Sequence, residues 1–176
     1  MYILGISAFY HDSAACLIKD GEIVAACQEE RFSRIKHDAS FPIQAANFCL
    51  EYAKIGINQV DYIAYYEKPL IKFVRIIETY LEYSPKGIKS FLTALPIWLQ
   101  NKLWIEDTIK KSLNYKGPII FPEHHESHVA SAYYPSPFTK AAILTLDGVG
   151  EWATTSYAIG NNNDINILAE LKFPNS

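Results

Sequence analysis

Two apolar segments near the N-terminus, residues 14–19 and 22–28, are separated only by Asp20 and Gly21. An Asp-Gly pair accepts the positive φ angles of a type I′ turn, so the two segments predict an antiparallel β-hairpin. Residues 2–9 form a further apolar run of strand length just before them. The chain is therefore expected to begin with a β-rich layer.

A helix and a fourth strand are predicted next. Apolar residues recur at helical spacing behind Pro42, a residue that suits the first position of a helix, and Gly56 is the expected end. Residues 61–66 are a short apolar and aromatic run, which predicts a strand.

Residues 69–115 form a long aromatic stretch in which apolar residues recur three and four positions apart. Ser84-Pro85 and Pro96 are expected to interrupt it, because proline cannot donate the helical hydrogen bond. We interpret the stretch as a helical insertion that packs on the sheet. A lid or a partner-docking surface is the alternative.

Four strands and one helix are predicted in the last third of the chain. The strands are residues 118–121, 141–146, 152–159 and 165–173, and the helix follows the first of them. The whole order predicts an α/β fold with a mixed sheet. The last strand has no covering element after it, so we expect the chain to be a truncated piece of a longer protein. The exposed sheet would be covered by the missing remainder or by a second copy in a homo-oligomer.

Composition restricts the class of protein. The chain has 176 residues, 49% of them hydrophobic, which suits a single globular domain. A net charge of −3 argues against nucleic acid or an anionic membrane as partner, and no apolar stretch reaches the roughly 20 residues of a membrane span. The three cysteines form no C-x-x-C pair and no signal peptide is visible, which favours reduced thiols and a cytoplasmic location.

His124 and His128 are four residues apart, so on a helix both imidazoles reach one ion. Asp147 ends a predicted strand, where α/β sheets place ligands. Two imidazoles and one carboxylate suit Fe(II), Zn or Mn, with open positions for substrate. Gly148 and Gly150 would let the backbone pass a phosphate. The alternatives are ordinary histidines and a plain turn.

Two further polar clusters follow predicted strands. His11 and Asp12 come after the first, and residues 29–38 come after the third. Arg31 and Lys36 in the latter cluster could hold a phosphate or steer a polar acceptor. A solvated charged loop is the alternative for this cluster.

Several motifs occur together in this chain: residues 3–6 (ILGI), 11–15 (HDSAA), 29–38 (EERFSRIKHD), 41–42 (FP), 124–132 (HHESHVASA) and 146–151 (LDGVGE). Together they resemble the N-terminal part of the O-carbamoyltransferases of the NodU/CmcH type, over essentially the whole chain. Residues 173–176 (FPNS) resemble the start of a family motif that continues further, in agreement with the expected truncation.

The resemblance implies a fold and an activity. The fold would be a ribonuclease-H-like or actin-like ATPase half-domain, with residues 1–176 as the N-terminal portion of the carbamoyltransferase domain. A separate domain would make carbamoyl adenylate from carbamoyl phosphate and ATP. The domain begun here would then pass the carbamoyl group to a hydroxyl of a small-molecule acceptor.

The resemblance also implies roles for individual residues. His124 and His128 match two histidines that bind iron, and Asp147 matches a carboxylate that touches both metal and carbamoyl adenylate. His11 and Lys36 fall where the family lines its acceptor pocket. A further metal aspartate and the adenylate-forming domain lie outside these residues, so we expect the 176 residues to be inactive alone.

We interpret His11 as the general base for the acceptor hydroxyl, with Asp12 and Arg31 also on the substrate and Gly148 and Gly150 beside the nucleotide. Two other functions stay open. One is a metal-dependent hydrolase or phosphotransferase on the same fold, with water in place of the alcohol. The other is a non-catalytic module that binds metal or nucleotide, or that docks a partner through residues 69–115.

Overall fold

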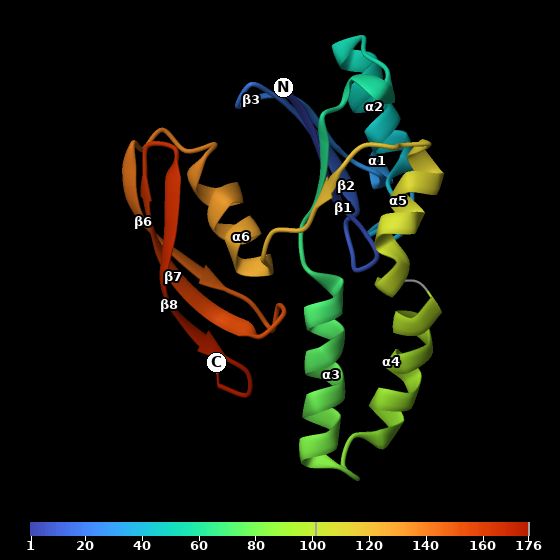
Figure 1. Cartoon of the computed structure of the whole chain (residues 1–176), viewed down its shortest axis with the longest axis vertical. Coiled ribbons are helices and arrows are strands. Elements are labelled where there is room, and N and C mark those ends of the chain that lie inside the picture. The colour runs from blue at the N-terminus through green and yellow to red at the C-terminus, as the bar shows by residue number, and fades with distance from the viewer. Residues whose placement is uncertain (101, 176) are drawn as a thin grey trace. The chain divides into compact units, whose positions relative to one another are not determined.

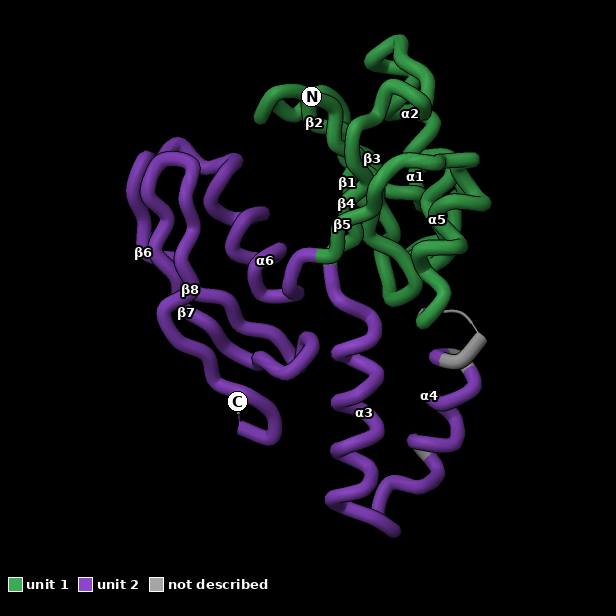
Figure 2. Tube along the Cα trace, in the orientation of Figure 1, with its two compact units in different colours: residues 1–66, 99–121 green, residues 67–98, 122–176 purple. Residues whose placement is uncertain are grey.

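The computed structural model describes residues 1–100 and 102–175 (Figure 1). The chain forms two compact units, coloured separately in Figure 2. The first unit contains residues 1–66 and 99–121, and the second contains residues 67–98 and 122–176. Each unit has its own cluster of buried apolar side chains.

The first unit is built on a five-stranded mixed sheet. Its elements are β1 (Tyr2–Ser7), β2 (Ala14–Lys19), β3 (Glu22–Gln28), α1 (Glu30–Ser33), α2 (Ile43–Ala53), η1 (Ile57–Gln59), β4 (Tyr62–Tyr65), η2 (Lys102–Trp104), α5 (Ile105–Leu113) and β5 (Ile119–Ile120). The strand order is β3-β2-β1-β4-β5, and β2 runs in the direction opposite to the other four strands. This is the order of the ribonuclease-H-like fold, so the predicted fold class is confirmed.

The β2–β3 hairpin forms as the Asp-Gly pair predicts. Lys19 pairs with Glu22 across the turn, and Asp20 and Gly21 have φ angles of 51° and 90°. A residue with a Cβ is strained at the second of these angles, so the glycine is required there.

Helices α2 and α5 supply the apolar cover of this sheet. In β1, Leu4 and Ile6 are buried, as expected for a strand with one face in the core. Cys49 of α2 and Ile109 of α5 are fully buried in the same cluster. The cysteine thus packs as a small apolar residue, and burial raises the pKa of its thiol to about 11.

Glu29 is the first residue of the segment 29–38, for which the sequence alone allows two interpretations, a solvated loop or a binding cluster. It is only 2% exposed, and its carboxylate accepts hydrogen bonds from the backbone N–H groups of Gln44 and Ala45 at 3.2 and 2.8 Å. These are unpaired donors at the start of α2, where a negative charge also suits the helix dipole. Glu29 therefore caps a helix.

The expected end of α2 at Gly56 is wrong. The helix ends at Ala53, and Lys54 takes a left-handed conformation with φ 56°. The N–H of Ile55 then bonds to the carbonyl of Leu50. A lysine accepts this conformation here because the closing hydrogen bonds offset its strain.

The second unit contains a three-stranded antiparallel sheet and three helices. Its elements are α3 (Pro69–Tyr83), α4 (Ile88–Gln100, whose last two residues belong to the first unit), α6 (His124–Tyr133), β6 (Lys140–Leu146), β7 (Ala153–Asn161) and β8 (Asp164–Lys172). The strand order is β6-β7-β8, and α6 lies along one face of the sheet (Figure 1). Val129, Tyr133, Ile143 and Ala158 form the core between helix and sheet.

Helices α3 and α4 lie side by side (Figure 1), joined by aromatic pairs. Tyr80 stacks on Phe91 at 4.1 Å between ring centroids, and Phe73 meets Trp98 at 6.0 Å. The predicted break at Pro96 is wrong, because α4 continues through it. Proline has a helical φ and forfeits only one hydrogen bond, and the two aromatic pairs hold the helix on both sides of it.

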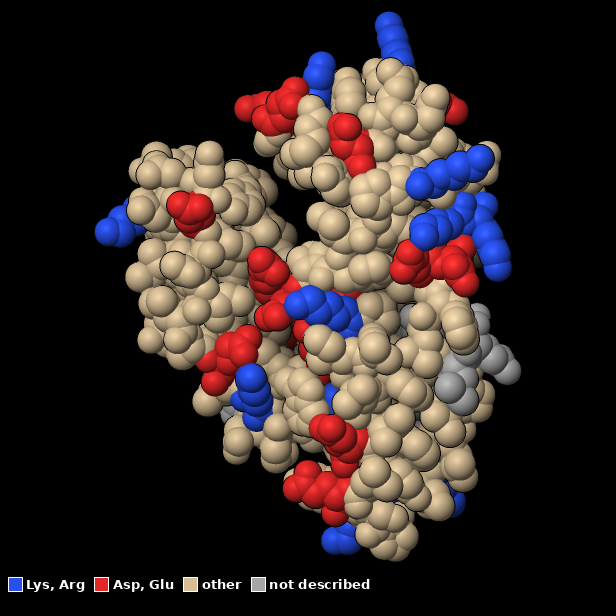
Figure 3. Space-filling model, viewed as in Figure 1, with Lys and Arg blue, Asp and Glu red and all other residues tan. Residues whose placement is uncertain are grey.

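Acidic and basic side chains lie next to one another at several places on the face drawn in Figure 3. Within the described part of the chain, no helix has the length and apolar character needed to cross a bilayer.

Replacing the buried cap Glu29 tests its structural role. Glu29→Ala removes the charged acceptor of the α2 start and should lower the free energy of unfolding by about 2–3 kcal/mol. Urea denaturation measures this. Glu51→Ala, on the exposed face of the same helix, is the control and should change stability by less than about 0.5 kcal/mol. Equal effects of the two variants would contradict the capping role.

Candidate metal centre

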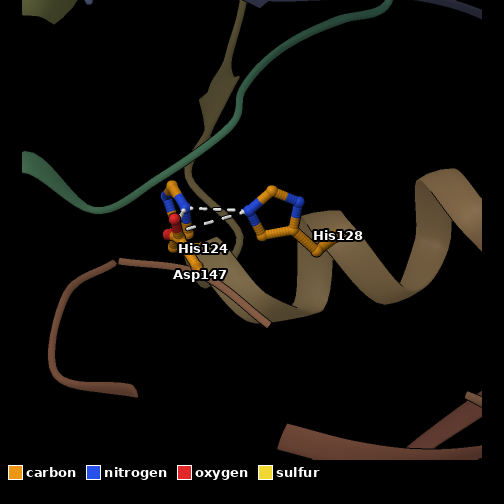
Figure 4. A group of neighbouring side chains, drawn as sticks. All are labelled: His124, His128 and Asp147. Atoms are coloured by element: carbon orange, nitrogen blue, oxygen red, sulfur yellow. Dashed lines mark hydrogen bonds and ion pairs between the residues drawn. The ribbon is translucent and has the colours of Figure 1, made fainter. Parts of the chain in front are cut away.

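Three side chains that lie far apart in the sequence meet at the start of α6 (Figure 4). His124 and His128 occupy successive turns of this helix, and Asp147 directly follows β6. The Nε2 atoms of the histidines are 3.0 Å apart. The Oδ2 atom of Asp147 lies 2.9 Å from His124 Nε2 and 3.9 Å from His128 Nε2.

The orientation of Asp147 is set by its own loop. Its Oδ1 atom accepts a hydrogen bond from the N–H of Gly148 at 2.7 Å, which leaves Oδ2 facing the histidines. Its backbone N–H is bonded to the carbonyl of Thr154 at 2.9 Å. The carboxylate therefore has one oxygen used by the turn and one directed to the cluster.

The separations fit a single small cation. Donor atoms bound to one Zn²⁺ at about 2.0–2.1 Å in a tetrahedron lie about 3.3 Å from each other. The three distances between the donor atoms described above are 2.9, 3.0 and 3.9 Å, which lie on both sides of this value. Two nitrogens and one oxygen suit Zn or Fe(II), so His124, His128 and Asp147 could hold either metal.

Electrostatics favour the neutral form of the more exposed histidine. Burial lowers the pKa of His128, and the neighbouring His124 lowers it further. A neutral imidazole is the form that coordinates metal.

A fourth residue, Glu67, lies behind the cluster and was not predicted from the sequence. Its side chain is 2% exposed, and one carboxylate oxygen lies 3.1 Å from His124 Nδ1 and 2.6 Å from Lys72 Nζ. Burial raises the pKa of Glu67, but the hydrogen bond from His124 and the charge of Lys72 outweigh it, and the pKa lies below its ordinary value. It lies two residues after β4, and the carboxyl ends of strands are where α/β sheets place ligands, so its position could have indicated it from the sequence.

Another buried glutamate fixes the start of α3. Glu151 accepts a hydrogen bond from the N–H of Lys68, the residue before the helix, at 2.5 Å. Burial raises the pKa of this carboxyl group, and the hydrogen bond from Lys68 opposes the rise. The ammonium of Lys68 lies 3.0 Å from Glu123, the residue before α6. The starts of α3 and α6 are thus linked within the second unit.

His125, between the two cluster histidines, points to the other side of α6. Its Nδ1 atom lies 2.7 Å from the hydroxyl of Thr145 on β6 and 3.0 Å from that of Ser156 on β7. The side chain is buried, so it fastens the helix to the sheet and is not a member of the cluster.

A cavity of about 190 Å³ lies beside His124. Its lining includes the carboxylates of Glu123, Glu151 and Glu170 and the ammonium of Lys172. With three acidic groups and one basic group, this cavity disfavours a bare phosphate.

Position 150 has to be a glycine because the His124 ring lies close to the backbone there. A Cβ at this position would lie 2.7 Å from Cδ2 and 2.9 Å from Cγ of His124, whereas a Cβ at Gly148 would meet nothing within 4 Å. The two glycines, predicted together as a phosphate-binding pair, therefore differ in their packing. Gly150 lets the His124 imidazole approach the backbone, whereas no side chain of the described residues packs against Gly148.

The remaining predicted site residues belong to the first unit. The Asp12 carboxylate lies between two imidazoles, 2.7 Å from His11 Nδ1 and 2.9 Å from His37 Nδ1. Hydrogen bonds from His37 and His11 hold the pKa of Asp12 below its ordinary value. Arg31, on α1, and Lys36 are both exposed. The loops after β1 and β3 thus meet, as their strand positions predict.

Comparison with protein families gives one match over nearly the whole chain. The family model described as carbamoyltransferase N-terminus matches residues 2–176. An uncharacterised protein of Synechocystis sp. is 55% identical over 99% of this chain and 30% of its own length. The nodulation protein NolNO of Sinorhizobium fredii is 33% identical over 97% of this chain and 24% of its own length.

A more distant relative and a solved structure were also found. An uncharacterised protein of Methanocaldococcus jannaschii is 29% identical over 97% of this chain and 35% of its own length. The structure of YeaZ from Pseudomonas aeruginosa aligns with a TM-score of 0.46 and 11% identity, over 99% of this chain and 69% of YeaZ. The chain spans 24% to 35% of the length of the three sequence relatives.

The contrast between the two glycines provides a test of the metal centre. Gly150→Ala should displace the His124 ring and weaken Zn²⁺ binding about tenfold or more, because ligand orientation controls metal affinity. Gly148→Ala is the matched control and should bind as the unsubstituted protein does. Competition titration against a chromophoric chelator measures both, and equal affinities would argue against a metal ligated by His124.

Proposed function

Since the chain belongs to the carbamoyltransferase family, as the N-terminal domain of that family, we propose that it carries the site of carbamoyl transfer. The donor would be carbamoyl adenylate and the acceptor a hydroxyl group of a small molecule. The observation that supports this most directly is the meeting of His124, His128 and Asp147. A cation held by these residues would offset the carboxylates that line the adjoining cavity, which binding of a phosphate-bearing donor requires.

The metal proposed for this site is Fe(II) or Zn, held by the Nε2 atoms of the two histidines and by Oδ2 of Asp147. When bound, it supplies a Lewis acid that polarises an oxygen of the donor. The chain's own contribution is to keep both imidazoles and the carboxylate in place. Gly148 and Gly150, next to Asp147, are proposed to let the backbone approach the adenylate phosphate.

In the proposed transfer step, the acceptor oxygen forms a bond to the carbamoyl carbon. The bond from that carbon to the phosphate oxygen breaks, AMP leaves, and the acceptor proton passes to a base. We assign the base to His11. Its Nδ1 atom faces the Asp12 carboxylate at 2.7 Å, so its Nε2 atom is the one that accepts the proton.

Positive side chains of the first unit are assigned to substrate binding. Arg31 and Lys36 are exposed and carry charges that can attract a phosphate or a polar acceptor. Asp12 orients His11 and contacts the acceptor. These roles are proposed from the resemblance of residues 11–15 and 29–38 to motifs of the family.

The rest of the reaction is proposed to take place outside these 176 residues. Because the chain spans only 24% to 35% of its relatives, synthesis of carbamoyl adenylate from carbamoyl phosphate and ATP is assigned to the remainder of the protein. We propose that the reaction occurs in the cytoplasm.

Removal of the metal ligands is the main test of this function. In the protein at its natural length, His124→Ala and His128→Ala should each lose most of the bound iron or zinc and at least about 100-fold in carbamoyl transfer. Elemental analysis and AMP release from carbamoyl phosphate and ATP measure the two effects. Glu126→Gln is the control, because its side chain faces the N–H of Glu123 at the helix start.

The same assay separates a transferase from a hydrolase. A transferase releases AMP together with a carbamoylated product only when a hydroxyl acceptor is present. Equal AMP release without acceptor would favour the metal-dependent hydrolase, and unchanged metal content in both histidine variants would contradict the metal site.

The role of His11 has its own test. His11→Ala should lower the turnover number about 10²–10⁴-fold, the usual contribution of a general base, while metal content stays unchanged. Normal turnover in this variant would contradict the assignment of the base.

A further inference from the structure

Glu67 occupies a position that neither the motif pattern nor the proposed transfer step assigns. It follows the carboxyl end of β4 by two residues and precedes α3. The side chain is buried to all but 2%, which is rare for a glutamate without a dedicated partner. Its partners are the ring of His124 and the ammonium of Lys72.

The contact with His124 determines which ring nitrogen carries the proton. A carboxylate can only accept, so the Nδ1 atom, 3.1 Å from Glu67, has to donate a hydrogen. With a cation at the cluster, the Nε2 atom is left to present its lone pair to that cation, and it lies 3.0 Å from His128 Nε2 and 2.9 Å from Asp147 Oδ2. The buried carboxylate thus selects the tautomer that a metal at this cluster requires.

The charge of Glu67 is balanced from α3. Lys72, in the first turn of this helix, places its ammonium 2.6 Å from the same carboxylate and is itself only 14% exposed. A buried carboxylate without such a partner is costly, so the pair stabilises the position of Glu67. The helix start is held in turn by Glu151, which accepts the N–H of Lys68 at 2.5 Å.

We propose that Glu67 is a positioning residue of the metal centre, which holds His124 in the Nδ1–H tautomer and directs its Nε2 atom to the cation. Lys72 supports it, so the first turn of α3 becomes part of the site. This inference rests on the proposed metal centre and extends it to a residue that touches neither metal nor substrate.

The first experiment is titration of the protein, at its natural length, with Zn²⁺ alone. In Glu67→Gln the side-chain amide can present either its oxygen or its NH₂ group to Nδ1, so the tautomer is no longer enforced. The affinity for Zn²⁺ should fall about 10- to 100-fold, the usual effect of losing such an outer partner. Glu78→Gln, an exposed glutamate of α3, is the matched control and should leave the affinity unchanged.

A second readout distinguishes positioning from a general structural role. In the Zn²⁺-loaded protein with ¹⁵N-labelled histidine, the ring nitrogens of His124 should show one tautomer, with hydrogen on Nδ1 and the metal on Nε2. In Glu67→Gln the two tautomers should both be populated. A variant that merely loosens the fold would lower the melting temperature without this change.

Glu67→Gln also removes a carboxylate charge beside the largely buried Lys72 ammonium, and this loss could itself unfold the unit, so a compensated variant is needed. Glu67→Leu/Lys72→Met removes the pair together and replaces it with apolar side chains of similar size. It should keep a cooperative melting transition and still bind Zn²⁺ 10- to 100-fold more weakly.

The outcomes separate this inference from the metal centre itself. If the unsubstituted protein binds no Zn²⁺, both are overturned. If it binds Zn²⁺ and the two Glu67 variants bind it equally well, with one His124 tautomer throughout, only the role of Glu67 is overturned. A Glu67→Gln effect of the same size in a His124→Ala background would also overturn it, because the effect has to pass through that ring.

Discussion

The metal centre depends on how α6 is held against the sheet of β6, β7 and β8. Val129 is fully buried on this sheet, and His125 is fixed by hydroxyl groups of β6 and β7. These contacts set the rotation of the helix about its axis. Because His124 and His128 project from a different side of the same turns, they face the end of β6, where Asp147 leaves the strand. The packing of α6 on this sheet therefore decides whether three distant residues can share a cation.

Buried glutamates organise both units in a similar way. Glu29 caps α2, Glu151 accepts the N–H group at the start of α3, and Glu67 joins Lys72 of α3 to His124. Each charge is buried and each has hydrogen-bond donors, which is the condition under which a carboxylate is tolerated in an interior. In the second unit this places helix starts and metal ligands in one connected network. The chemistry proposed for the family domain thus rests on structural carboxylates as much as on its ligands.

Much of the fold could be predicted because most of its strands and helices depend on residue patterns within short segments. Alternation and length marked the strands, and the Asp20-Gly21 pair specified the hairpin directly. One of the two errors lies where a distant contact decides, and the other is local. Pro96 stays inside α4 because aromatic pairs with α3 hold that helix, and Gly56 does not end α2 because Lys54 closes the helix first. Like the course of α4, the buried role of Glu29 depends on a distant contact, here with Ala45 of α2, 16 residues further along the chain.

The sequence by itself determined the order of strands and helices, the family, and the spacing that puts His124 and His128 on one side of a helix. These are properties of short segments or of motifs, and they need no knowledge of the packing. Only the tertiary structure decided that Asp147 points its free oxygen at those histidines and that Glu67 lies behind them. The physical reason is that such contacts join separate elements, and their distances follow from how side chains pack between a helix and a sheet.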